Sequence, residues 1–177
     1  TIRTQGGVSM TGDGLEAYFH SQASGLFQIL RMTRASLLST WSTPVVVSEL
    51  AVGGSWGRPH GGPAISNDGL QIIIVYLSPW PSSSYDFYHA TRTSRTGKFR
   101  APVLLPELNT YMNSSQGHWT RDGFSFYHGI KEMGDIYRAD LILPICIPSG
   151  QPTRRQPFDV ACRRDPGDVG VAVGSLT

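Results

Sequence analysis

Three Asp-Gly pairs at nearly constant spacing place the strongest constraint on how this 177-residue chain folds. They are Asp13-Gly14, Asp68-Gly69 and Asp122-Gly123, and the step from the first pair to the second is almost equal to the step from the second to the third. Each pair precedes a run with the composition of a β-strand. Because glycine adopts positive φ without steric cost and aspartate tolerates it, we expect each pair to form a tight hairpin turn at an equivalent place in a repeated unit.

A second stretch of sequence repeats in register with these turns. Thr33-Arg34 aligns with Thr91-Arg92, and the match continues without a gap to Trp41, which takes the place of Phe99. We interpret this aromatic position as packing between repeats. A third copy keeps an Asp-Ile-Tyr segment at 135–137 and degrades after Leu143. The pattern indicates three copies, at about residues 8–62, 63–117 and 118–143.

The second copy shows most clearly what one unit contains. Its strand candidates are Pro63–Ser66, Leu70–Leu77, Asp86–Thr93 and Pro102–Leu105. Leu70–Leu77 is apolar on both faces, so its sheet is expected to be covered on both sides. Four antiparallel strands in a period of this length describe a β-propeller blade. We therefore predict an all-β fold of about three four-stranded antiparallel blades, and an incomplete propeller, because closure takes about four to eight blades.

One segment leaves an alternative open. Leu26–Thr43 contains neither Gly nor Pro, and its apolar residues recur at near-helical spacing. Its ungapped match to a segment that holds Gly97 favours strands over a helix.

Residues 144–177 do not continue the repeat, because five prolines interrupt them and the strand pattern is lost. We expect an irregular, Pro-rich extension with one short strand at Val169–Val173. Cys146 and Cys162 form no C-x-x-C motif, and whether they pair stays open.

The motifs together resemble the WD-like propeller repeats of the TolB type. Pro63-Ala-Ile-Ser-Asn-Asp-Gly69 fits the Pro-x-Ser-x-Asp-Gly turn of that family, and Asp86-Phe-Tyr and Asp135-Ile-Tyr match its next strand. The first copy departs from the family, since Gln28-Ile-Leu replaces Asp-Ile-Tyr. The resemblance covers about residues 8–143. It implies a bacterial, often periplasmic or otherwise extracytoplasmic propeller used for binding, and it implies no catalytic residues.

Catalytic and metal-binding motifs are weak in this chain. The segment 53–57 matches the G-x-S-x-G pattern of hydrolases around Ser55, but the Pro- and Gly-rich residues after it cannot form the helix which that motif needs. The histidines show no H-E-x-x-H spacing. We expect no catalytic residue, no metal site and no cofactor. A pair of the turn aspartates acting as in a glycosidase is a minor alternative.

The loops give the best candidates for binding. In a propeller, the connections between blades and the loops between the two middle strands emerge on one face. Aromatic and arginine side chains, which are enriched at interfaces, gather in these two loop classes. The candidates on this predicted loop face are Trp56, Arg58, His60, Trp80, Tyr85, Tyr111, Asn113 and His118. The alternative is that Trp56 and Trp80 pack beneath their own loops.

The sequence thus predicts a non-catalytic binding or scaffold module for a protein or cell-envelope glycan. The alternatives are the propeller part of a larger hydrolase, peptidase-gating or glycosidase, and a fragment without independent function. The net charge of +2 does not indicate a nucleic-acid partner, and the longest apolar run, Ile72 to Leu77, is too short to predict a membrane span. Open propeller ends also predict self-association.

Overall fold

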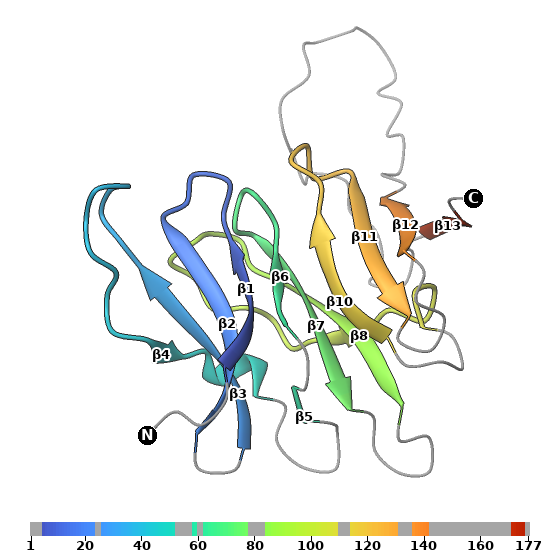
Figure 1. Ribbon diagram of the computed structural model, residues 1–177, viewed down its shortest axis with the longest axis horizontal. Helices are drawn as coiled ribbons and strands as arrows, with labels where there is room; N and C mark the ends of the chain where they lie inside the picture. The colour runs from blue at the N-terminus through green and yellow to red at the C-terminus, as the bar shows by residue number, and fades with distance from the viewer. Residues whose placement is uncertain are drawn as a thin grey trace, which may run out of the picture.

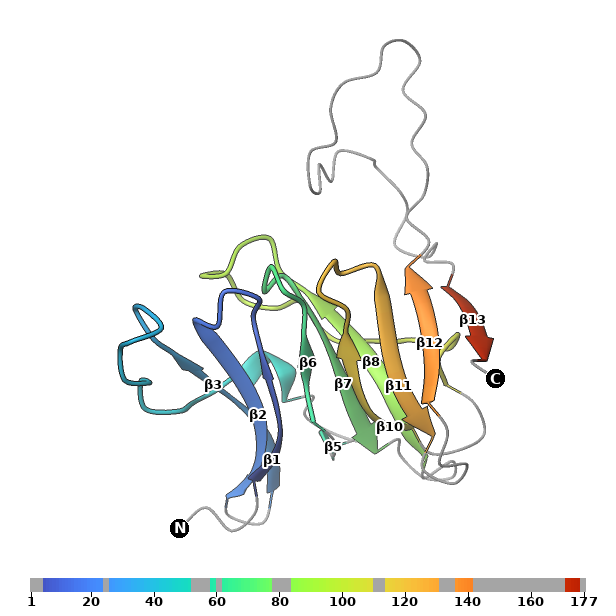
Figure 2. The same ribbon diagram turned by 45° about the horizontal axis from the view of Figure 1, so that its top comes forward.

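The computed structural model describes residues 5–23, 26–51, 58–59, 62–77, 84–109, 114–130, 136–141 and 171–175. In this part of the chain the structure consists of three antiparallel sheets and one short 3-10 helix. The sheets follow one another in chain order and do not close into a ring (Figures 1 and 2). The predicted all-β class and the incomplete propeller are therefore confirmed.

Sheet one contains the first four strands in the order of the chain. A 3-10 helix, η1 (Ser48–Leu50), follows its last strand. The third strand begins inside the segment for which a helix was the alternative, and it pairs with the second over its whole length. The strands are β1 (Gln5–Met10), β2 (Glu16–Ala23), β3 (Leu26–Thr33) and β4 (Val45–Val46).

Sheet two lies between the other two sheets (Figure 2). Its strands are β5 (Arg58–Pro59), β6 (Ala64–Ile65), β7 (Gln71–Leu77), β8 (Tyr85–Thr91) and β9 (Val103–Leu104). Both β5 and β6 pair with β7, so together they form the inner strand of this sheet. Residues 72–76 of β7 are at most 3% exposed. An apolar run on both faces predicts this burial, because each face packs against a neighbouring sheet.

Sheet three contains one strand that the repeat pattern did not predict. It is formed by β10 (Ser114–Trp119), β11 (Ser125–Ile130), β12 (Ile136–Leu141) and β13 (Val171–Ser175). A short strand was expected in the extension at 169–173, and the structure has it at 171–175, paired antiparallel with β12. This strand completes sheet three, a role that sequence reasoning did not give to it. Residues 142–170, which include both cysteines, lie outside the described residues.

The three Asp-Gly turns have the same geometry. Gly14, Gly69 and Gly123 adopt φ of 67°, 75° and 74°. In each turn the hydroxyl two residues before the aspartate donates a hydrogen bond of 2.5 to 2.7 Å to its carboxylate. The same carboxylate oxygen accepts a bond from the amide two residues after the aspartate. The hydrogen bonds of the aspartate side chain therefore stabilise each turn, in addition to the positive φ of its glycine.

The inner strands of the three sheets meet at one point. Gly7, Gly62 and Gln116 occupy equivalent places in the three copies, at the same spacings as the Asp-Gly turns. A Cβ atom placed on Gly7, whose φ is +57°, would lie 2.3 Å from the Cα of Gly62 and 3.1 Å from the Nε2 of Gln116. Only glycine permits this approach of the two backbones. The strand β1 and the strand β10 each have a register shift beside this point.

Two apolar clusters fill the spaces between the sheets. The first joins Tyr18 and Ile29 of sheet one to β7 and to Phe99 of sheet two. The second joins the opposite face of β7 and Phe87 to Phe126 of sheet three. Alternate residues of β7 enter the two clusters, as the period of a strand requires.

Candidate functional site

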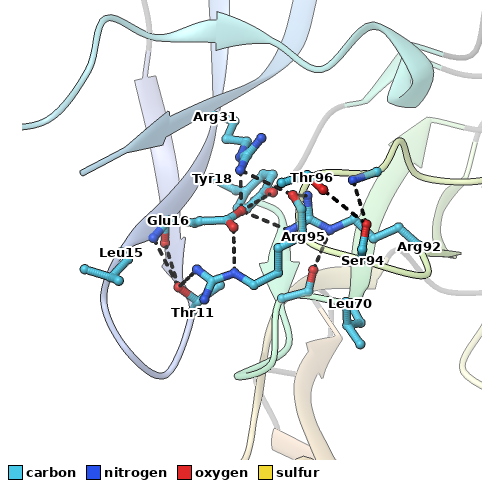
Figure 3. A network of polar contacts seen from close by, with 12 residues as sticks. Thr11, Leu15, Glu16, Tyr18, Arg31, Leu70, Arg92, Ser94, Arg95 and Thr96 are labelled. Carbon is cyan, nitrogen blue, oxygen red and sulfur yellow. Dashed lines mark hydrogen bonds and ion pairs between the residues drawn. The ribbon is translucent and has the colours of Figure 1, made fainter. Parts of the chain in front are cut away.

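A buried glutamate and three arginines form a dense cluster of charges between sheets one and two (Figure 3). Glu16 begins β2 directly after the first Asp-Gly turn, and its side chain is only 5% exposed. Its carboxylate accepts hydrogen bonds from Arg31 at 3.0 Å, from Arg92 at 2.9 Å and from Arg95 at 2.7 Å. The hydroxyl of Tyr18 donates a fourth, at 2.8 Å. The carboxylate is therefore saturated with donors.

The backbone of sheet two fixes the position of Arg92. Its Nε donates to the carbonyl of Gly69 at 2.7 Å, and its Nη1 donates to the carbonyl of Arg95 at 2.7 Å. Its guanidinium carbon lies 4.6 Å from the centre of the Phe99 ring. The remaining nitrogen, Nη2, reaches Glu16 across the interface. The planar group thus makes contacts in one fixed orientation, as a guanidinium does better than an ammonium group.

These contacts also fix the protonation state of the acids. Burial alone raises the pKa of Glu16, but the hydrogen bonds from Arg92 and Arg95 outweigh it and lower the pKa to about 2. The hydrogen bond from Arg95 lowers the pKa of Asp13 well below its usual range. A carboxylate that stays ionised and has its oxygens occupied is a poor proton acceptor. The cluster therefore holds two sheets together and is not suited to acid–base chemistry.

A small cavity of about 200 Å³ lies beside the cluster. It is bounded by β3, β4 and the segment after β8 that carries Arg92 and Phe99, and both Arg31 and Glu49 line it. Pockets for drug-sized ligands usually measure about 300–1,000 Å³. The cavity can thus accept a side chain or a few water molecules but not a typical organic ligand.

The interface between sheets two and three has a different chemistry. His128 is buried, with its ring centre 5.1 Å from that of Phe87 and 5.8 Å from that of Tyr137. Gln71, which takes the place of Glu16 in the repeat, bonds through Oε1 to the Nε2 of His89 at 3.0 Å. Burial lowers the pKa of His89 to about 4 and also lowers the pKa of His128. Both histidines are therefore neutral at pH 7.

Most of the predicted loop-face residues lie outside the described residues. These are Trp56, His60, Trp80, Tyr111 and Asn113, and Ser55 of the G-x-S-x-G segment lies there too. Arg58 is described only by its backbone, on β5. Tyr85 is half-buried against the second apolar cluster, and His118 is exposed on β10. The binding role of this set therefore stays a prediction.

The strand registers place both loop classes at one edge of the sheets. Gln5 pairs with Ser21, Arg58 with Leu77, and Ser114 with Ile130. In every sheet the beginning of the inner strand thus lies beside the end of the second strand. The connections between sheets and the loops between the middle strands leave from this edge, which we call the loop edge. The Asp-Gly turns lie at the opposite edge, the upper one in Figure 1.

Hydrogen bonds between sheets tie the edge of the Asp-Gly turns together. The amide of Gly12 donates to the carbonyl of Asn67 at 2.9 Å. The side-chain amide of Asn67 in turn donates to the carbonyls of Thr120, at 3.2 Å, and Arg121. Each sheet is thus joined to the next through its turn, and this edge has little freedom to reshape around a ligand.

Sequence reasoning missed the glutamate–arginine cluster. The available signal was the pair of matched arginines, Arg34 and Arg92, which occupy the same place in two copies. Nothing in the local sequence indicates that Glu16, far from Arg92 along the chain, faces it. The contact depends on how the sheets stack, and a repeat pattern does not specify the side chains that meet across an interface.

The described part of the chain offers neither a cluster of metal ligands nor a long apolar helix. Within these ranges, no three His, Cys, Asp or Glu side chains lie close enough together to bind a metal ion. No helix there is long and apolar enough to span a membrane.

Comparison with known proteins identifies the fold. No model of a protein family matches the chain, and the search of curated proteins finds no match. Among solved structures, the chain is similar to TolB from Acinetobacter baumannii, with a TM-score of 0.52 and 16% sequence identity. The match covers 77% of this chain and 30% of the TolB chain, so this chain spans less than one third of that protein's length. At this identity the likeness shows a β-propeller fold and nothing about activity.

Proposed function

We propose that the chain is a non-catalytic β-propeller module that binds a protein partner through its loop edge. The observation that carries this proposal is the contrast between the two edges of the sheets. The edge of the Asp-Gly turns is held by ion pairs and hydrogen bonds between sheets, whereas the registers bring both loop classes to the other edge. A rigid scaffold that carries loops on one edge is the usual arrangement of a binding surface.

The side chains that we assign to this surface favour a protein partner. By sequence, Trp56, Trp80 and Tyr111 belong to the connections that join these strands, and Arg58 begins β5. These residue types are enriched in the energetically important centres of protein interfaces. The hydrolase alternative has no observation in its favour among the described residues, since the one dense group of acids there is occupied by arginines.

The proposal is tested by capture of partners from a bacterial envelope extract. Immobilised wild-type chain is compared with the double variant Trp56→Ala/Trp80→Ala, and bound proteins are quantified by mass spectrometry. The matched control is Leu37→Ala/Leu38→Ala, which removes two exposed apolar side chains, 63% and 98% accessible, at the other edge. We expect the tryptophan variant to lose at least tenfold of a captured protein that the control retains.

Two results would count against this function. Equal capture by the tryptophan variant places the binding surface elsewhere. Co-sedimentation of the chain with purified peptidoglycan, lost in the same variant, makes the partner a cell-envelope glycan instead of a protein.

A further inference from the structure

Arg34 in sheet one repeats nearly every contact of Arg92 in sheet two. Its Nε donates to the carbonyl of Gly14 at 2.8 Å, as that of Arg92 does to Gly69. Its Nη1 donates to the carbonyl of Leu37 at 3.1 Å, and its guanidinium carbon lies 4.4 Å from the centre of the Trp41 ring. The two arginines are therefore held in the same orientation relative to their own sheets.

One contact of Arg92 has no counterpart at Arg34. The Nη2 of Arg92 binds Glu16 of the neighbouring sheet, whereas Nη2 of Arg34 has no carboxylate partner among the described residues. Arg34 belongs to the face of sheet one that is turned away from sheet two, which we call the first outer face. Trp41 was expected to pack between repeats, as the buried Phe99 does, but it is only partly buried on this face, which no described sheet covers.

The first outer face is also apolar. Met10 pairs with Ala17, and Leu30 pairs with Val46, so these residues share the face opposite to Tyr18. Ala17 and Leu30 are buried on this face, whereas Met10 is 52% exposed and Val46 is 39% exposed. An apolar sheet face with a guanidinium at its margin is what sheet two presents to sheet one.

The opposite end of the molecule carries the complementary side chains. Phe126 and His128 point toward sheet two, so Ser125 and Tyr127 lie on the face of sheet three turned away from it, the second outer face. Tyr127 pairs with Arg138 there, as Tyr18 pairs with Arg31 in sheet one.

This second outer face also carries a carboxylate. Asp140 pairs with Ser125, which takes the place of Glu16, and it accepts hydrogen bonds from the Ser125 hydroxyl at 2.5 Å and from Arg138 at 2.7 Å. Its side chain is half-exposed. The second outer face thus repeats the tyrosine, arginine and acid that sheet one presents to Arg92, with the acid moved to the adjacent strand.

These charges are not a general property of the repeat. At the interface between sheets two and three, Gln71 and His89 replace the acid and the arginine, and Leu141 stands where sheets one and two have Arg34 and Arg92. Among the described residues, no ion pair joins sheets two and three. Arg34 on the first outer face has no described carboxylate partner, and Asp140 on the second outer face is a half-exposed acid. The two outer faces are therefore complementary in charge.

We propose that the second outer face of one copy of the chain packs against the first outer face of a second copy, with Asp140 accepting a hydrogen bond from Arg34. The contact is head-to-tail, so two copies make it twice and close a ring. Two copies supply six sheets, which lies within the four to eight blades of closed propellers. In this ring the exposed apolar side chains of the first outer face, such as Met10 and Val46, are covered by the second outer face of the other copy.

This inference uses surfaces other than the loop edge, so the two proposals stand or fall separately. The molar mass of the full chain is measured by size-exclusion chromatography with light scattering, at micromolar concentration and low salt. We expect twice the 19.3 kDa of one chain. Trp56→Ala/Trp80→Ala, the variant that tests the loop edge, leaves this mass unchanged.

Charge reversal tests the pairing directly. Arg34→Glu and Asp140→Arg are each expected to shift the protein to the mass of one chain, and the combined variant is expected to restore the two-chain mass. Asp140→Asn is a milder variant, expected to weaken association at least tenfold, in case the reversal disturbs the sheet. Lys98→Glu changes the charge equally at an exposed site of sheet two and serves as the control. Circular dichroism confirms that each variant is folded.

Three outcomes overturn the inference. The first is a wild-type chain with the mass of one chain. The second is a two-chain mass that survives both charge reversals. The third is assembly that continues beyond two copies, because the contact then does not close.

Discussion

The two interfaces between sheets are held together by different kinds of side-chain contact. Between sheets one and two, a buried glutamate binds three arginines and a tyrosine hydroxyl. Between sheets two and three, aromatic rings pack around a buried histidine, and a neutral glutamine–histidine pair occupies the equivalent place. The repeat thus determines the strands and turns, whereas the side-chain contacts differ from one interface to the next. The two interfaces are therefore expected to respond differently to mutation and to pH.

Removing the charge of Glu16 is expected to have the largest effect. In Glu16→Gln the side chain of Arg92, only 2% exposed, stays buried without its counter-ion. Breaking a buried pair in this way costs about 3–5 kcal/mol. Urea unfolding followed by tryptophan fluorescence measures the loss, and a loss below about 1 kcal/mol would show that water replaces the missing charge.

The second-largest effect is expected from replacing Gly7, which lies where the inner strands of the three sheets meet. In Gly7→Ala a positive φ is combined with a clash between the added Cβ and the backbone of Gly62, and we expect the free energy of unfolding to fall by roughly 2–4 kcal/mol. Gly123→Ala is the matched control, because its φ is +74° but no atom lies within 4 Å of the added Cβ. That variant is expected to cost about 1 kcal/mol, from backbone strain alone. Equal losses in both variants would mean that the inner strands move apart without penalty.

Acid should weaken the two interfaces in different pH windows. The pKa of His89 falls from 6.5 to about 4 on folding, so the unfolded chain binds the proton more readily and stability is lost as the pH falls from about 6.5 to 4. The pKa of Glu16 falls from 4.5 to about 2, so its contribution is lost only below about pH 4.5. Urea midpoints at pH 7, 5.5 and 4.5 separate the windows. His89→Gln should reduce the loss of stability in the upper window, and the loss that remains belongs to His128, whose pKa is also lowered by burial. An unchanged pH dependence in His89→Gln would show that this histidine does not cause the acid sensitivity.

The smallest loss of stability is expected from breaking the neutral pair of Gln71 and His89. Gln71→Ala removes one hydrogen bond to His89 and is expected to cost about 1 kcal/mol, in line with a hydrogen bond between uncharged groups. The same urea experiment measures it. A loss as large as that of Glu16→Gln would show that the two interfaces depend equally on polar contacts. It would contradict the view that only the interface between sheets one and two relies on them.

Local signals in the sequence predicted the strands and turns, because a turn depends on neighbouring residues. The positive φ of Gly69 and the bonds of Asp68 follow from the Ser-Asn-Asp-Gly segment itself. The strand β13 could not be assigned to sheet three, because its partner β12 lies far back along the chain and no repeat spacing remains to link them. The residues of the loop face also come from connections that lie far apart in the sequence, so local signals do not show which of them lie together.

The distant origin of β13 has a consequence for the order of folding. The strands β2 and β3 are joined across two residues, whereas the whole stretch 142–170 separates Leu141 from Val171, which pair in β12 and β13. The entropy lost on closing a loop grows with its length, and contacts of long sequence separation form slowly. Sheets one and two can be complete while β12 is still an edge strand. During synthesis, this edge is therefore open to pairing with another polypeptide until residues 171–175 arrive.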